Sequence, residues 1–250
     1  MKNYLYLVRV FFATSFYLKY RRSYFGYLWS LANPIFMITS VAFVFSSILR
    51  VEFSDYILYV YAGMIPWLFI SHSIFSSCNV FLSNEALIRK VRINLAILPV
   101  ANLLVVLFDS LLTSILYLTL LLITNSILGI SLWQLFIGYI VLTFFCFGCA
   151  LIFSVTTVYF RDLQWLIQML MQTLFFLTPV LYKPELLSDS AQFVVKLNPL
   201  TPLIELFSGI LRGQTLDLHL WIISSLVSVS AFLIGVIIYS LNRRIIIFRL

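Results

Sequence analysis

Charge is scarce in this sequence. Only 10% of the 250 residues are Asp, Glu, Lys or Arg, and 62% are hydrophobic, whereas charged residues make up about 25% of a typical soluble domain. The uncharged stretches are long enough to match the thickness of a bilayer. The scarcity of charge therefore excludes a soluble fold and indicates that lipid is the solvent of this chain.

Cysteine and histidine are rare as well. Cys78, Cys146 and Cys149 all lie in apolar stretches, which argues against a disulfide framework. Cys146 and Cys149 form a single CxxC, and without a second pair we interpret it as helix packing rather than a metal or redox site. The sequence therefore predicts no metal site.

Motifs of catalysis are missing too. The chain has no GxxxxGKS or GxxxxGKT loop, no nucleophile elbow and no paired carboxylates, and its two histidines are far apart. We therefore do not expect it to bind a nucleotide, to hold a cofactor or to act as an enzyme by itself, and a partner would have to bind any ATP and Mg²⁺. The net charge of +7 is spread over short basic clusters between apolar stretches, so no nucleic-acid partner is expected.

Six apolar stretches predict an all-α, polytopic integral membrane protein. A helix rises about 1.5 Å per residue, so about 20 residues cross a hydrocarbon core of about 30 Å. The predicted spans are 31–49, 56–78, 95–123, 132–159, 163–182 and 220–241. Turn-forming residues at 124–126 divide the third span from the fourth. We expect an interfacial segment at 1–30 and a six-span transmembrane domain at 31–250.

Basic residues are distributed unevenly between the two sides of these spans. Twelve of the sixteen Lys and Arg lie in the segments that share a side with both termini. The other side holds six of the nine acidic residues. Because Lys and Arg are retained on the cytoplasmic side, both termini are predicted to be cytoplasmic.

Two segments are neither spans nor plain loops. Residues 1–30 mix five basic residues with eleven aromatic ones, which is typical of a helix that lies at the membrane interface and contacts membrane lipids. The 183–217 segment is long and contains two short apolar stretches, so we expect short helices at 186–197 and 202–212. Thr201 is expected as the N-cap of the second helix, Pro202 in its first turn, and Gly213 as its end. These helices would suit an external gate, and an interfacial cap fits the pattern equally well.

Asp109 and a set of aromatic residues are the candidates for the channel. Asp109 is a carboxylate near the middle of a span, where it marks a functional site or is a structural residue hydrogen-bonded to a neighbouring Ser or Thr. Aromatic residues form 17% of the chain; most should belong to interfacial belts, and those that face inward would offer flat surfaces for sugar rings. The channel or gate candidates are Tyr24, Trp29, Tyr56, Tyr59, Trp67, Asp109, Tyr182, Pro199 and Pro202.

Five stretches in order along the chain carry a family resemblance. They are YRRSYFGYLW (20–29, leading to the Asn-Pro at 33–34), NEALIRKV (84–91), VYFRDL (158–163), TPVLY (178–182) and NPLTP (198–202). Together with six spans, this set resembles the permeases of type-2 ABC exporters that move O-antigen, capsule or teichoic acid chains. Phe25 departs from the family, which commonly has a small aliphatic residue before that glycine.

The resemblance implies a function, an assembly and a location. The chain would be a homodimer in the bacterial cytoplasmic (inner) membrane, with two copies of a separate cytoplasmic ABC ATPase. It would export a lipid-linked polysaccharide, as in lipopolysaccharide or capsule biosynthesis. By the same resemblance, Arg21 and Arg22 would meet the lipid diphosphate, the segment 84–92 would dock on the ATPase, and residues 183–212 would gate the exit.

The composition of the docking segment agrees with a short amphipathic helix. Asn84 can cap it, Glu85 suits its positive end, and Arg89 and Lys90 suit its negative end. Leu87, Ile88 and Val91 would supply an apolar stripe that docks on the ATPase or lies in lipid. Arg161 and Asp162, in the other short cytoplasmic connection, are further coupling candidates.

Other functions remain open on the residues alone. The first is an ABC permease for a drug or a small lipid, which the neighbouring genes would distinguish. The second is a proton-coupled secondary transporter that uses Asp109 and needs no ATPase. A membrane acyl- or glycosyltransferase comes last because the sequence offers no catalytic set.

Overall fold

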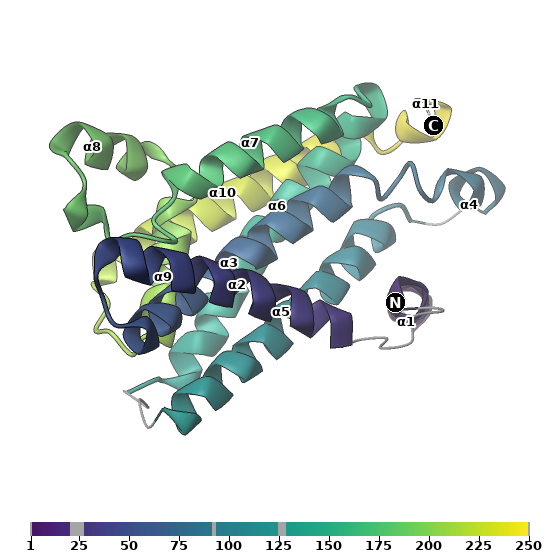
Figure 1. Cartoon of the computed structure of the whole chain (residues 1–250). Coiled ribbons are helices and arrows are strands. Elements are labelled where there is room, and N and C mark those ends of the chain that lie inside the picture. Colours follow the sequence, from purple (N-terminus) through teal and green to yellow (C-terminus); the bar gives the residue numbers. More distant parts are fainter. Residues whose placement is uncertain (1, 21–27, 92–93, 125–128, 250) are drawn as a thin grey trace.

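The computed structural model of the chain describes all residues except 1, 21–27, 92–93, 125–128 and 250 (Figure 1). The described residues form helices and connecting loops, with no strand among them. Both termini lie at one end of the helix bundle, beside the helix α4 (Glu85–Lys90) and the last helix, α11 (Ile246–Arg249). We call this the proximal end and the opposite end, which carries α8 (Asp189–Leu197), the distal end.

In the part of the chain that the structure describes, five helices are long and apolar enough to cross a membrane. They are α2 (Leu28–Leu49), α3 (Phe53–Cys78), α5 (Ile97–Ile123), α6 (Leu132–Tyr159) and α10 (Leu218–Asn242). The fourth predicted span has the bounds of α6, and the other four differ from their helices by at most three residues at either end. The all-α, polytopic fold predicted from the sequence is confirmed.

The fifth predicted span is shorter than expected. Helix α7 covers Leu163–Leu177 only, so its 15 residues rise about 22 Å instead of continuing to Tyr182. Thr178 is extended, with φ −108° and ψ 138°, because the ring of the following Pro179 disfavours the helical conformation at the residue before it. Residues 179–182 form turns and bends, with the Val180 N–H donating to the Thr178 carbonyl at 2.7 Å, and this segment continues from α7 to the distal end (Figure 1).

The 183–217 segment contains a single-turn helix, η1 (Pro184–Leu186), followed by α8 and α9 (Thr201–Leu211). The expected helix at 186–197 begins only at Asp189, and α9 begins one residue before Pro202. Gly213 follows α9 with φ 65°, as expected of a residue that ends a helix. The N-cap prediction for Thr201 is wrong, because its hydroxyl donates to the Val195 carbonyl at 2.7 Å and ties α9 to α8.

Helix α9 is not an interfacial cap. It makes an angle of 94° with α8 and packs against α3, α6 and α10. Nine of its eleven residues are buried. A short helix at membrane depth is tolerated when protein surrounds it, so α9 fits the external-gate alternative considered above, whereas α8 projects from the distal end (Figure 1).

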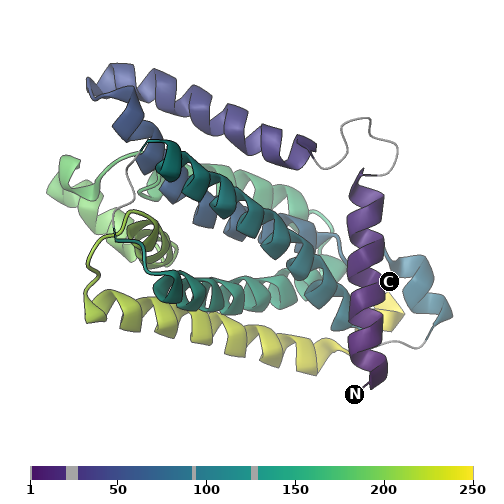
Figure 2. The same ribbon diagram turned by 90° about the horizontal axis from the view of Figure 1, so that it is seen from below.

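The N-terminal helix α1 (Lys2–Tyr20) crosses the other helices rather than joining them. Figure 2 shows it running across the proximal end of the bundle, nearly at right angles to the spans. It packs against α5, where Phe16 meets Phe108 edge-to-face with ring centroids 5.5 Å apart. This position agrees with the helix at the membrane interface that residues 1–30 predict.

The closest helix pair is α6 and α10. A Cβ added at Gly148 would collide with the backbone of Ala231, and one added at Gly235 would collide with the backbone of Gly148. The two backbones therefore approach as closely as glycine permits, which is the usual way for membrane helices to gain packing contact. Cys146 and Cys149 are buried nearby as free cysteines.

Candidate functional site

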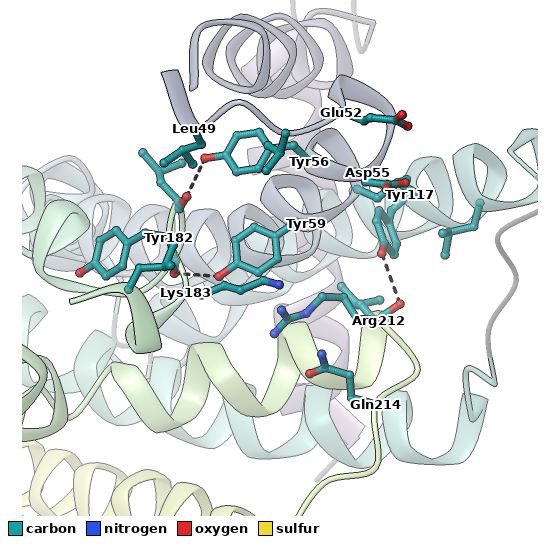
Figure 3. A pocket seen from close by; sticks show the side chains of 16 residues that line it. Leu49, Glu52, Asp55, Tyr56, Tyr59, Tyr117, Tyr182, Lys183, Arg212 and Gln214 are labelled. Carbon is teal, nitrogen blue, oxygen red and sulfur yellow. Dashed lines mark hydrogen bonds between the residues drawn. The ribbon is translucent and has the colours of Figure 1, made fainter. Parts of the chain in front are cut away.

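A cavity of about 810 Å³ opens at the distal end. Figure 3 shows it between the beginning of α3, the end of α5, the chain that follows α7, and the end of α9. Its lining residues are Leu49, Val51, Glu52, Asp55, Tyr56, Leu58, Tyr59, Tyr117, Leu121, Leu181, Tyr182, Lys183, Leu186, Leu211, Arg212 and Gln214. This volume lies within the range of about 300–1,000 Å³ that is usual for small-molecule sites.

Three tyrosines tie the walls of the distal cavity together. The hydroxyl of Tyr56 donates to the Leu181 carbonyl at 2.6 Å, and that of Tyr59 donates to the Tyr182 carbonyl at 2.7 Å. From α5, the Tyr117 hydroxyl donates to the Leu211 carbonyl at 3.3 Å. These bonds, drawn in Figure 3, join α3 to residues 178–182, which we call the linker, and α5 to the end of α9.

The linker is held by further contacts. A Cβ at Gly63 of α3 would lie 3.0 Å from the Val180 carbonyl oxygen, so glycine allows the linker to lie directly on α3. The Asn198 amide donates to the Thr178 hydroxyl at 2.8 Å and its oxygen accepts from the Leu200 N–H at 3.0 Å. One asparagine therefore connects the linker to the corner between α8 and α9.

The two candidate prolines have structural positions near this corner. Pro199 is exposed between α8 and α9. Pro202 lies in the first turn of α9, where the missing N–H costs nothing, and its carbonyl accepts from the Ser224 hydroxyl of α10 at 2.9 Å. The pair shapes the corner and anchors α9, and neither proline lines the distal cavity.

Four charged side chains line the distal cavity. The Arg212 guanidinium lies 4.8 Å from the centroid of the Tyr59 ring, a cation–π distance, and donates to the carbonyl and the hydroxyl of Ser208 at 3.2 and 3.1 Å. Glu52, Asp55 and Lys183 are exposed at the rim (Figure 3). The wall therefore combines two carboxylates with two cations.

The structure brings together three of the predicted channel residues and separates the others that it describes. Tyr56, Tyr59 and Tyr182 share the distal cavity. Trp67 is buried against Phe175, with ring centroids 5.3 Å apart. Tyr24, Arg21 and Arg22 lie outside the residues that the structure describes.

Asp109 and Trp29 also lie away from the distal cavity. Asp109 is half-buried on α5, about 12 Å along the helix from Tyr117, and its neighbour Phe108 packs on α1. Trp29 is exposed in the first turn of α2. The sequence reasoning missed Tyr117, and it included Arg212 only as the last residue of the 183–212 segment expected to gate the exit.

The docking segment at the proximal end differs from its prediction in one respect. Ile88 is only 5% exposed and packs inside this chain. Its apolar cluster consists of Val80, Phe81, Ile88, Leu95, Leu98, Val155, Val158 and Ile246. Because Ile88 already has partners within the chain, the apolar stripe that the sequence predicts for docking is reduced to the half-buried Leu87 and the exposed Val91.

The exposed part of the docking segment is mainly charged. Arg89 and Lys90 are exposed, and Arg89 pairs with Glu85 one turn earlier at 2.9 Å. Asn84 precedes the helix without capping it, because its amide donates instead to the Val80 carbonyl at 2.8 Å. Arg161 and Asp162 are exposed in the α6–α7 connection at the same end of the bundle.

Comparison with known proteins shows the family to which this architecture belongs. Residues 6–211, from α1 to the end of α9, match the model of the ABC-2 type transporter family. The chain belongs to this family. As an ABC-2 type transporter it is a multi-pass membrane protein, which agrees with its apolar helices.

Curated relatives of this ABC-2 type transporter come from two bacteria. An O-antigen export system permease protein RfbA of Klebsiella pneumoniae is 29% identical over 206 residues, which cover 80% of each chain. A second RfbA of the same species is 26% identical over 80% of this chain and 77% of the relative. The RfbA of Myxococcus xanthus is 26% identical over 77% of this chain and 75% of the relative.

Proposed function

We propose that this chain is the transmembrane subunit of an ATP-driven exporter that moves a lipid-linked, O-antigen-like polysaccharide across the bacterial inner membrane. The observation that carries the proposal is its similarity to permeases of O-antigen export over about 80% of both chains. A separate ATPase would hydrolyse ATP, since the sequence lacks the phosphate-binding loop that this reaction needs.

In the proposed assembly two copies of the chain surround a pore and two ATPase subunits lie beneath them. The proximal end faces the cytoplasm in this arrangement, because the basic residues concentrate on the side of both termini. The docking segment and the Arg161–Asp162 connection then face the ATPase. The distal cavity and α8 face the exterior.

The orientation can be tested with reporter fusions. A reporter placed after Arg50 or at Gln192, both at the distal end, should report the outside, and a reporter at the C-terminus should report the cytoplasm. A C-terminus on the outside would contradict the even number of membrane crossings, and it would therefore contradict the proposed exporter function as well.

The decisive experiment for the proposed function is purification of the chain from its native membrane. An ABC ATPase should co-purify in equal numbers, and mass spectrometry should detect a lipid-linked polysaccharide in the complex. Deletion of the gene should leave that glycolipid on the inner leaflet. Recovery of the chain without an ATPase, together with proton-driven transport, would favour the secondary-transporter alternative instead.

Arg21 and Arg22 are proposed to bind the phosphates of the lipid carrier at the inner leaflet. Two adjacent guanidinium groups can each bind phosphate with paired hydrogen bonds. Substituting both by Gln should abolish export while ATPase association and membrane insertion survive. Export at the normal rate would leave these arginines only the role of anchoring the chain to anionic lipids.

The docking segment is proposed to bind the ATPase through its charged face. The Arg89→Glu, Lys90→Glu double variant should weaken co-purification of the ATPase with little change in thermal stability, because both side chains are exposed and an exposed pair such as Glu85–Arg89 contributes only about 0.2–0.5 kcal/mol. Ile88→Asp should lower stability as well, since it places a carboxylate inside an apolar cluster, at a cost of several kcal/mol.

Arg243 and Arg244 provide the matched control for this experiment. They are also an exposed pair of cations that follows a helix on the proximal side. Reversing their charge should leave ATPase association largely intact. If the Arg89→Glu, Lys90→Glu variant binds the ATPase and transports normally, this face is not part of the coupling path. Arg161 and Asp162 are then the remaining coupling candidates.

A further inference from the structure

We propose that the distal cavity binds an uncharged, hydroxyl-rich sugar segment, and that acidic or cationic chains bind it less tightly. This inference rests on the proposed export function for the source of the sugar. Its chemistry comes from the lining of the distal cavity itself. Three features carry it, namely the unused hydrogen-bonding groups, the balance of charge and the rigid apolar walls.

The distal cavity offers many unused hydrogen-bonding groups. Arg212 has five N–H donors, and two bonds to Ser208 occupy its Nε and one of its terminal nitrogens. Glu52 and Asp55 pair with no cation in the part of the chain that the structure describes. Because sugar hydroxyls both donate and accept, a neutral saccharide can use the carboxylates and the guanidinium at once.

The charges of the distal cavity select against a charged polymer. Because two carboxylates and two cations share the cavity, a charged chain meets like charges as well as opposite ones, and its attraction to one pair is offset by repulsion from the other. Its own charges also lose hydration on binding, a cost that an uncharged saccharide avoids. The four charged groups also disfavour a lipid acyl chain, since it would desolvate them without providing hydrogen bonds.

The remaining walls suit the carbon–hydrogen faces of sugar rings. Leucine side chains from α2, α3, α5 and the linker line the space between the charged groups. Tyr56 and Tyr59 stack with ring centroids 6.1 Å apart, and their hydroxyls are already bound to the linker. The walls are therefore fixed before a ligand arrives, which lowers the entropic cost of binding.

Two neighbouring residues of α2 allow a test by blocking. Leu49 lines the distal cavity and is 39% exposed, whereas Ile48 is 66% exposed and does not line it. Leu49→Trp should fill the entrance without disturbing the core, and Ile48→Trp is the matched control. The probes are neutral tetrasaccharides (maltotetraose, cellotetraose and mannotetraose), tetragalacturonate and the glucosamine tetramer, titrated by saturation-transfer NMR onto the complete chain in lipid nanodiscs.

At least one neutral tetrasaccharide should bind about tenfold more tightly than either charged probe. Leu49→Trp should weaken that binding by about tenfold or more, and Ile48→Trp should leave it unchanged. A charge reversal gives the second arm. Glu52→Lys with Asp55→Lys should shift the preference to tetragalacturonate, whereas Asp189→Lys, an exposed acid of α8 outside the distal cavity, should not.

Several results would overturn the inference. It fails if the wild-type chain prefers tetragalacturonate, if no neutral probe binds, or if Leu49→Trp binds as well as the wild type. It also fails if native mass spectrometry finds a phospholipid that Leu49→Trp expels and that sugars do not displace.

The inference and the proposed function can fail separately. If the chain exports polysaccharide in cells but a neutral probe binds the Leu49→Trp variant as tightly as the wild type, the inference is wrong and the proposed function stands. If the chain has no ATPase partner and does not support export but still prefers neutral sugars, the proposed function is wrong and the sugar site remains.

Discussion

Replacing Gly148 with alanine should leave little correctly packed protein in the membrane. The new Cβ would collide with the backbone of Ala231 on α10, and neither backbone can move without displacing a whole helix. Overpacking usually costs about 1–3 kcal/mol and more where backbone must shift. The measurement is the yield of monodisperse protein and its melting temperature in detergent.

Gly138 is the matched control for this substitution because it lies on the same helix. A Cβ there would lie 2.9 Å from the end of the Ile210 side chain and 3.3 Å from the Phe207 ring, and side chains can shift where backbone cannot. Gly138→Ala should therefore cost clearly less stability than Gly148→Ala. Equal tolerance of alanine at Gly138 and Gly148 would mean that the close contact of α6 and α10 does not limit stability.

Replacing both Tyr56 and Tyr59 with phenylalanine should release the linker. The change removes two hydroxyl donors and leaves the carbonyls of Leu181 and Tyr182 without their bonds. Each lost bond is worth about 1 kcal/mol, so opening of the linker becomes cheaper by about 2 kcal/mol and amide exchange there roughly thirtyfold faster. Hydrogen exchange with mass spectrometry on peptides that cover 178–186 measures this.

Tyr139→Phe provides the control for the linker experiment. The Tyr139 hydroxyl bonds to Ser110 and Ser114 inside the bundle, so its loss should lower global stability and leave the exchange at 178–186 unchanged relative to the neighbouring peptides. If the double tyrosine variant stays protected, the packing of Val180 on Gly63 and the Asn198–Thr178 bond hold the linker by themselves.

The spans were predictable because bilayer thickness dictates the length of an apolar stretch. Residues 132–159 became α6 with unchanged bounds. The end of α7 was also readable in principle, since Pro179 restricts Thr178, but the apolar residues that follow concealed it. The predicted span followed the hydropathy of these residues and neglected the effect of Pro179 on the backbone of Thr178.

Contacts between distant parts of the chain could not be predicted in the same way. Tyr117 and Leu211 are 94 positions apart, and the cluster around Ile88 includes Ile246 from the last helix. An amphipathic pattern in α4 says that one face is apolar and not which protein covers it. The docking stripe was therefore assigned to a partner, although this chain covers part of it.

The early end of α7 has a consequence for the surrounding bilayer. Two carbonyls of its last turn are satisfied by side chains, Leu174 by the Thr178 hydroxyl at 2.6 Å and Phe176 by the Tyr182 hydroxyl at 3.0 Å. The helix thus ends stably after about 22 Å, whereas α3, with 26 residues, rises about 39 Å. Lipids beside the distal part of this crossing therefore meet the linker, whose carbonyls are bonded to tyrosines of α3, in place of a continuous helix.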